Sequence, residues 1–224
     1  MKENIYVLLS GPDKRKYFND NIKNELKKLI KDDCIVSTLS ADFNNYEKND
    51  KFFHGSESSL GLKDKLLDIN NNIKEINLID NRIDSNNIEN KIKESNILFL
   101  MGGDPHLQMD SILKYKELFT NKIIISISAG TMNLSNCSYY SKDDTINFSH
   151  FYKGLGLIDI TIDPHFDINN SEQYNEALYF SKINPIIGLP NESCVVINDN
   201  IKFVGEHYVF EDGTLKNSFY NSLN

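Results

Sequence analysis

The chain of 224 residues contains no tryptophan and only two arginines, Arg15 and Arg82. Arginine is the usual bidentate partner of a carboxylate or a phosphate. The 32 acidic side chains outnumber the 24 lysines and arginines, so the formal net charge is -8. Because such a chain offers no concentrated basic stripe, we expect no nucleic-acid partner.

Cysteines and long apolar runs are also scarce. The three cysteines, Cys34, Cys137 and Cys194, are widely spaced and odd in number. They therefore predict neither a disulfide framework nor a CxxC metal pair. The first apolar run is too short for a signal peptide, and no run approaches the length of a membrane span. We expect a cytoplasmic protein without a membrane partner, and no motif indicates a cofactor or a metal ion.

The order of the apolar segments predicts the fold class. Buried strands are expected at 5–10, 34–39, 76–79, 97–101 and 123–127, and helical spacing occurs over 18–30, over 88–94 and after 105. Strands whose side chains do not alternate are typical of parallel sheets buried on both faces. We therefore predict one α/β domain over 1–224, with a doubly wound, mostly parallel sheet.

The last third of the chain has a different pattern. Residues 158–162 alternate, as in a half-buried strand, and 172–181 have helical spacing. Turn residues then separate short runs at 194–197, 201–204 and 208–210. Such runs predict antiparallel hairpins after the parallel sheet.

Ser128 lies where a buried strand gives way to small residues and a helix. Ala129 and Gly130 follow it directly. This is the context of a nucleophile elbow, in which a tight strand-to-helix turn lifts the serine side chain above the sheet. The alternative is an ordinary serine that caps the next helix.

Gly102 and Gly103 close the preceding predicted strand. Ligands of parallel α/β sheets bind at the carboxyl ends of the strands, so these glycines and Ser128 are expected at one site. The backbone N–H groups of Gly103 and Ala129 would there form an oxyanion hole. The alternative for the two glycines is a flexible strand-to-helix turn.

A serine hydroxyl needs a base to act as a nucleophile. His165 is the best of the five histidines, because it follows a predicted strand and Pro164, which restricts the chain. The alternative is a surface or capping histidine. His106, near the paired glycines, is a second candidate, as a substrate contact.

These motifs together resemble the peptidase E and cyanophycinase group of serine peptidases, peptidase family S51. The resemblance extends from Tyr6 to about Gly205 and is carried by 102–108, 126–130, 163–166 and 188–190. It implies a glutamine-amidotransferase-like, flavodoxin-like three-layer sandwich. It also implies that Ser128 is the nucleophile, that His165 is the base, and that the N–H groups of Gly103 and Ala129 bind the oxyanion.

The sequence leaves the identity of the third catalytic residue open. The resemblance places an acid after Gly-Leu-Pro, where this chain has Asn191, followed by Glu192. Asn191 can orient an imidazole, as asparagine does in papain-like enzymes. Asp143 is a further candidate by resemblance, and a solvated loop residue is the alternative for all three.

The resemblance implies a dipeptidase-like hydrolase that cleaves short peptides through an acyl-enzyme. Aspartyl dipeptidase-like members hold an acidic side chain with an arginine after the histidine motif, but 166–184 contains no arginine and only Lys182. An aspartate-specific pocket is therefore not expected, and a homodimer is allowed on general grounds. One rival is a non-catalytic binding or scaffolding protein on the same fold. An amidase of the glutamine-amidotransferase type ranks lower, because those enzymes have a cysteine at the elbow.

Overall fold

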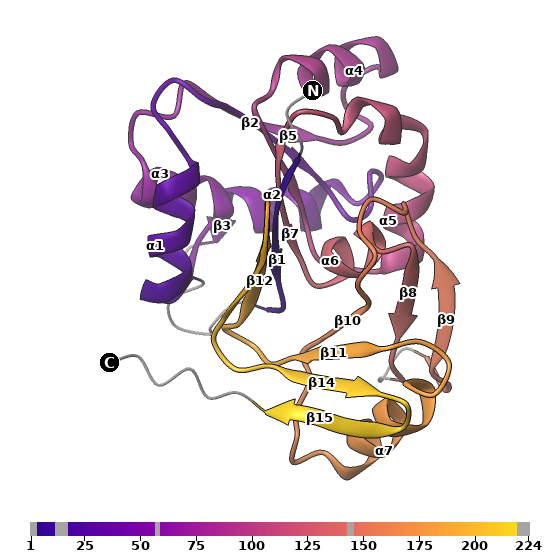
Figure 1. Ribbon diagram of the computed structural model, residues 1–224. Helices are drawn as coiled ribbons and strands as arrows, with labels where there is room; N and C mark the ends of the chain where they lie inside the picture. Colours follow the sequence, from indigo (N-terminus) through magenta and orange to yellow (C-terminus); the bar gives the residue numbers. More distant parts are fainter. Residues whose placement is uncertain (1–3, 12–17, 57–58, 143–145, 219–224) are drawn as a thin grey trace.

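The computed structural model describes residues 4–11, 18–56, 59–142 and 146–218 (Figure 1). The helices are α1 (Asp20–Leu29), α2 (Tyr46–His54), α3 (Leu62–Ile69), α4 (Ser85–Glu94), α5 (Pro105–Ile112), the 3-10 helix η1 (Leu113–Leu118), α6 (Ala129–Leu134) and α7 (Ser171–Phe180). The strands are β1 (Ile5–Leu9), β2 (Ile35–Leu39), β3 (Gly55–Ser56), β4 (Ser59–Leu60), β5 (Glu75–Ile79), β6 (Ile97–Leu100), β7 (Ile123–Ile127), β8 (Cys137–Tyr140), β9 (His150–Lys153), β10 (Ile162–Pro164), β11 (Ile186–Leu189), β12 (Cys194–Ile197), β13 (Ile201–Val204), β14 (Tyr208–Glu211) and β15 (Thr214–Ser218). None of these helices is long and apolar enough to cross a bilayer.

A seven-stranded main sheet has the order β13-β12-β1-β7-β6-β2-β5. The five strands from β1 to β5 in this order are parallel, whereas β12 is antiparallel to both of its neighbours. All five parallel strands lie within one residue of the predicted runs. The prediction of a mostly parallel α/β sheet is therefore confirmed.

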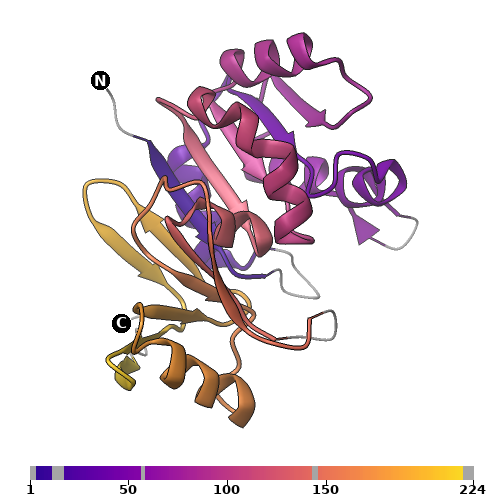
Figure 2. The ribbon, with the colours of Figure 1, turned by 90° about the vertical axis from the view of Figure 1, so that its right-hand side faces the viewer.

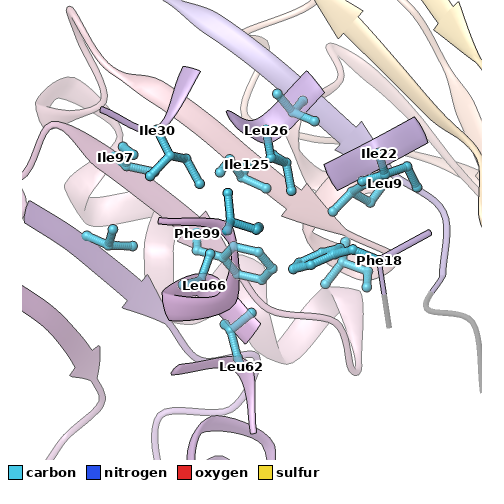
Figure 3. Packing of buried hydrophobic residues seen from close by; sticks show 14 of the residues in the cluster. Leu9, Phe18, Ile22, Leu26, Ile30, Leu62, Leu66, Ile97, Phe99 and Ile125 are labelled. Carbon is cyan, nitrogen blue, oxygen red and sulfur yellow. The ribbon is translucent and has the colours of Figure 1, made fainter. Parts of the chain in front are cut away.

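Helices cover both faces of the main sheet, and each face has its own apolar core. On one face α1 and α3 contribute Ile22 and Leu66 to the cluster that contains Phe99 of β6 (Figure 3). On the other face Leu98 of β6 and Ile112 of α5 belong to a second cluster. Neighbouring residues of one strand thus serve opposite cores, which is why the strand is apolar throughout.

A second sheet of four strands, β10-β11-β14-β15, lies beyond the carboxyl ends of the parallel strands (Figures 1 and 2). Helix α7 packs on it, and Phe166, Ala177 and Phe210 belong to the third apolar cluster. Gly188 of β11 is in close contact with the ring of Phe166, since a Cβ at this glycine would lie 2.7 Å from the ring. The second sheet thus has a core on its α7 side, whereas Ile162 of β10 and Leu189 of β11 belong to the second cluster of the main sheet.

The predicted C-terminal hairpins are divided between the two sheets. Strands β12 and β13 form a hairpin at the edge of the main sheet, whereas β14 pairs with β11 and β15 in the second sheet. The strand expected over 158–162 begins only at Ile162. Before it, Ile158 forms only an isolated bridge with Ser135, and the carbonyl of Ile160 accepts a hydrogen bond from the hydroxyl of Ser135. The hairpins β3–β4 and β8–β9 were not predicted.

Candidate active site

Ser128 forms a strained turn between β7 and α6. Its backbone has φ 53° and ψ -115°, and its N–H donates to the carbonyls of Leu9 (3.1 Å) and Ser10 (3.0 Å) of the neighbouring strand end. A positive φ is unfavourable for a residue with a Cβ, so the surrounding structure must hold this turn. The Ser128 hydroxyl makes no capping bond to α6. The geometry is that of the elbow and differs from that of a capping serine.

Small side chains close the elbow. A Cβ at Gly130 would lie 2.7 Å from the carbonyl oxygen of Leu100, and a Cβ at Gly102 would lie 3.2 Å from the Cβ of Ser128. The hydroxyl of Thr131 donates to the carbonyl of Leu9 at 2.7 Å and so fastens α6 to β1. The elbow therefore needs glycine where the strands and α6 approach each other.

His165 follows β10 directly and also has a positive φ, of 60°. Its backbone N–H donates to the hydroxyl of Ser10 at 2.7 Å. The same hydroxyl donates to the carbonyl of Leu189 at 2.6 Å and is fully buried. Ser10 thus connects the end of β1 in the main sheet to β10 and β11 in the second sheet.

The side chains of Ser128, His165 and Asn191 form a hydrogen-bonded line. His165 Nε2 lies 2.8 Å from Ser128 Oγ, and His165 Nδ1 lies 2.7 Å from Asn191 Oδ1. With the amide oxygen as acceptor, Nδ1 carries the proton and the lone pair of Nε2 faces the hydroxyl. Two residues separated by 37 positions in the chain are thus within hydrogen-bonding distance.

Gly11 makes room for this line. A Cβ on Gly11 would lie 2.2 Å from Asn191 Oδ1 and 2.5 Å from Cε1 of His165. Neither Gly11 nor Ser10 was recognised from the sequence. The signal for both was present, because small residues at the end of a buried parallel strand had already indicated Ser128 and Gly103.

The three candidates for the third catalytic position have different places. Asn191 contacts the imidazole directly. Glu192 has φ 66°, and its backbone groups bind Gly11 and the side chain of Asn19. Asp143 lies outside the described residues. Geometry therefore favours Asn191, which occupies the position beside Nδ1.

A cleft with a volume of about 360 Å³ opens beside Ser128 and His165. Gly103, Pro105 and Tyr140 lie on the side of the main sheet and of the β8–β9 hairpin. Residues of α7 and of the loop before it form the other side. Gly103 has φ 155° and could not carry a side chain, since a Cβ would lie 2.5 Å from the Cβ of Ala41. Ala129, the other predicted oxyanion residue, is the buried first residue of α6.

His106 stands at the rim of this cleft region. Its ring lies parallel to that of His150, with 5.6 Å between centroids, and 5.7 Å from the ring of Tyr140, which lines the cleft. The contact to Ser128 is made by His165. A role for His106 as a substrate contact stays a prediction.

Asp163 is a buried carboxylic acid two residues before His165. It is 1% exposed, one oxygen accepts a hydrogen bond from Ser141 at 2.9 Å, and the other oxygen has no partner. Burial raises the pKa of Asp163 to about 7, the bond from Ser141 opposes this rise, and repulsion by Glu176 adds to it. The sequence marked the surrounding Asp-Pro-His-Phe segment but gave this carboxyl no role.

The fold and this site define a class of protein. A serine on a strand-to-helix elbow, hydrogen-bonded to an imidazole that is oriented by a third side chain, is the arrangement of the serine hydrolases. The sequence model of peptidase family S51 matches residues 61–204. The chain therefore belongs to peptidase family S51 and is a serine-type peptidase.

One solved structure supports the fold independently. It is described as a candidate peptidase E from Listeria monocytogenes EGD-e and superposes with a TM-score of 0.60. The match covers 91% of this chain and 98% of that chain, at 14% sequence identity. The search of curated proteins gives no significant match.

Proposed function

We propose that the protein hydrolyses short peptides, with Ser128 as the nucleophile and His165 as the general base. The observation that carries this proposal is the 2.8 Å contact between Ser128 Oγ and His165 Nε2. Ser128 Oγ attacks the peptide carbonyl while Nε2 accepts its proton. The imidazolium then protonates the leaving amine, and water releases the acyl group from Ser128 in a second addition and elimination.

Asn191 is the third member of the proposed set. Its amide oxygen fixes the tautomer of His165 that presents a lone pair to the serine. A neutral amide orients the ring but provides no negative charge to stabilise the imidazolium. The arrangement therefore resembles the asparagine-containing sets more than the aspartate-containing ones.

The proposed oxyanion hole consists of the N–H groups of Gly103 and Ala129. Gly103 lines the same cleft as Ser128. Ala129 begins α6, and the first N–H groups of a helix have no acceptor within the helix. Such donors stabilise the tetrahedral oxyanion because they are already oriented when the charge develops.

The sheet order supports the finer, glutamine-amidotransferase-like assignment of the fold. Strands β2, β5, β6 and β7 follow one another as parallel strands in the chain and lie in the order β5-β2-β6-β7. This corresponds to the 2-1-3-4 part of the flavodoxin-like order. In such sheets ligands bind outside the carboxyl ends of the strands, and Ser128 lies at one of these ends.

Replacing the nucleophile tests the proposed function. We expect Ser128→Ala to lower kcat/KM on a library of dipeptides and tripeptides by at least about 10⁴-fold, as for other serine peptidases. Its thermal unfolding should be close to that of the wild type, because the Ser128 hydroxyl supports no helix cap. Ser111→Ala, on the exposed face of α5, is the matched control and should keep full activity. Undiminished turnover by purified Ser128→Ala protein would refute the proposal.

A further inference from the structure

The two sides of the cleft differ in chemistry. Near Ser128, Met132 and Tyr140 offer apolar surface. The opposite side carries Asp167, Glu172 and Glu176, from α7 and the loop before it. A substrate group in this cleft therefore lies between apolar atoms on one side and carboxylates on the other.

The described part of the cleft has an excess of negative charge. Lys142 is its only lysine or arginine among the described residues, and its Nζ lies 2.6 Å from a carboxylate oxygen of Glu172. Asp167 and Glu176 have no ion pair within the described residues. A bound cation would give these two carboxylates a partner, whereas a carboxylate on the substrate would be repelled.

Glu176 interacts electrostatically with several neighbouring groups. Its side chain is half-buried and accepts a hydrogen bond from the hydroxyl of Ser149. The pKa of the Lys142 ammonium is raised by its bond to Glu172 and, in addition, by the charge of Glu176. Glu176 also contributes to the raised pKa of Asp163. Glu176 therefore lines the cleft with a carboxylate that the hydroxyl of Ser149 holds in place.

We propose that this cleft binds a positively charged group of the peptide, an ammonium or a guanidinium, next to the bond that Ser128 attacks. The inference rests on the proposed function. Glu176 and Asp167 hold the charge, and the aliphatic part of the substrate lies along Met132 and Tyr140, as the stems of lysine and arginine do on apolar surfaces. The same charge occurs on a lysine or arginine side chain and on a free α-amino group.

Aminomethylcoumarin amides of lysine, leucine and aspartate, each with a free and with an acetylated α-amino group, distinguish the two sources. We expect kcat/KM for the free lysine amide to exceed that for the free aspartate amide by at least about 100-fold. A lysine preference that survives acetylation assigns the charge to the side chain. If the preference disappears with acetylation and the acetyl-leucine amide is cleaved slowly, the charge belongs to the α-amino group. A wild-type preference for the aspartate amides would overturn the proposal. It would also be overturned if the lysine and leucine amides were cleaved equally in both series and acetylation had no effect.

Two substitutions with opposite expected effects keep the test valid if one of the variants fails to fold. Glu176→Gln keeps an acceptor for Ser149 and should lower the ratio of kcat/KM for the preferred cationic amide to kcat/KM for acetyl-leucine amide about tenfold. Lys142→Met removes the competing cation and should raise the same ratio severalfold. Glu89→Gln, on the distant helix α4, is the matched control. Equal ratios of cationic to neutral substrate in wild type and both variants would contradict the assignment.

Labelling of Ser128 by a fluorophosphonate separates this inference from the proposed function. Failure of the wild type to react and to cleave any amide would refute the proposed function, and the cation site with it. If Ser128 reacts, lysinamide should slow the labelling, and the N-acetylated amide of aspartic acid, which carries no ammonium, should not. Equal protection by both compounds would overturn the cation site and leave the serine peptidase intact.

Discussion

The two sheets of this protein contribute different parts of one site. The main sheet supplies Ser128 on a rigid elbow whose surroundings are fully buried. The second sheet and its loops supply His165, Asn191 and the α7 side of the cleft. The comparison teaches that the nucleophile and its base come from different sheets, so that reactivity depends on how these sheets are joined.

The joint consists of two residues at the end of β1. Ser10 binds the backbone of His165 and of Leu189, and Gly11 leaves space for the imidazole and the amide. Catalysis is sensitive to errors of about 1 Å in the position of reacting groups. Substitutions at the joint should therefore lower activity, whereas matched substitutions elsewhere in the main sheet should lower stability alone.

Gly11→Ala gives the largest expected effect at the joint. The added Cβ would overlap Asn191 and His165, which are exposed side chains that can move away. We expect kcat/KM to fall by about 100-fold, because the imidazole leaves its place beside Ser128, while the melting temperature changes little. Peptide kinetics and calorimetry on the same preparation measure both quantities. Activity within twofold of the wild type would show that the line of side chains is not needed in this geometry.

Ser10→Ala sharpens the comparison with a matched control in the main sheet. It leaves the N–H of His165 and the carbonyl of Leu189 without their partner, at a cost of about 1–3 kcal/mol in unfolding free energy. Ser40→Ala removes a similar buried hydroxyl, which donates to Ile79 away from the site. We expect both variants to lose stability, but only Ser10→Ala to lose kcat, by about tenfold. Equal kcat in the two variants, measured by steady-state kinetics, would mean that Ser10 acts only on stability.

Asp163→Asn has the smallest expected effect on activity and concerns the second sheet alone. The folded-state pKa of about 7 lies above the ordinary aspartate value of 3.8, so the folded protein binds the proton more tightly than the unfolded chain. The unfolding free energy of the wild type should therefore fall as the pH rises from about 4 to about 7, by up to about 1.4 kcal/mol per pH unit. Asp163→Asn removes this contribution. Urea unfolding at pH 4 to 8 should give a flatter curve for the variant, and parallel curves would contradict the assignment.

The sequence was informative where one physical signal dominated. Strands buried on both faces must be apolar throughout, so β1, β6 and β7 were predictable from their runs, and Ser128 from the small residues after β7. His165 was proposed because it follows the end of a predicted strand and because Pro164 restricts the chain there. That His165 meets Ser128 followed from resemblance, since spacing along the chain does not fix a contact between two sheets.

Other features depend on three-dimensional packing and have no local pattern. The division of the C-terminal strands between two sheets is decided by which edge each strand reaches, and neighbouring hairpins look alike in sequence. The choice between Asn191 and Glu192 was open because it depends on the turn at Glu192, where φ is 66°. The charge of the cleft arises from side chains of α7 that face the nucleophile, which periodicity alone did not reveal.

The central claim is that the imidazole of His165 activates the hydroxyl of Ser128. The most direct measurement is the rate at which a fluorophosphonate labels Ser128, located by peptide mass spectrometry, in the wild type and in His165→Asn. Asparagine tolerates the positive φ at this position but is no base. We expect rapid labelling of the wild type at Ser128 and a loss of about 10³-fold or more in the variant. Equal labelling rates in the two proteins, or labelling of another residue, would contradict the account.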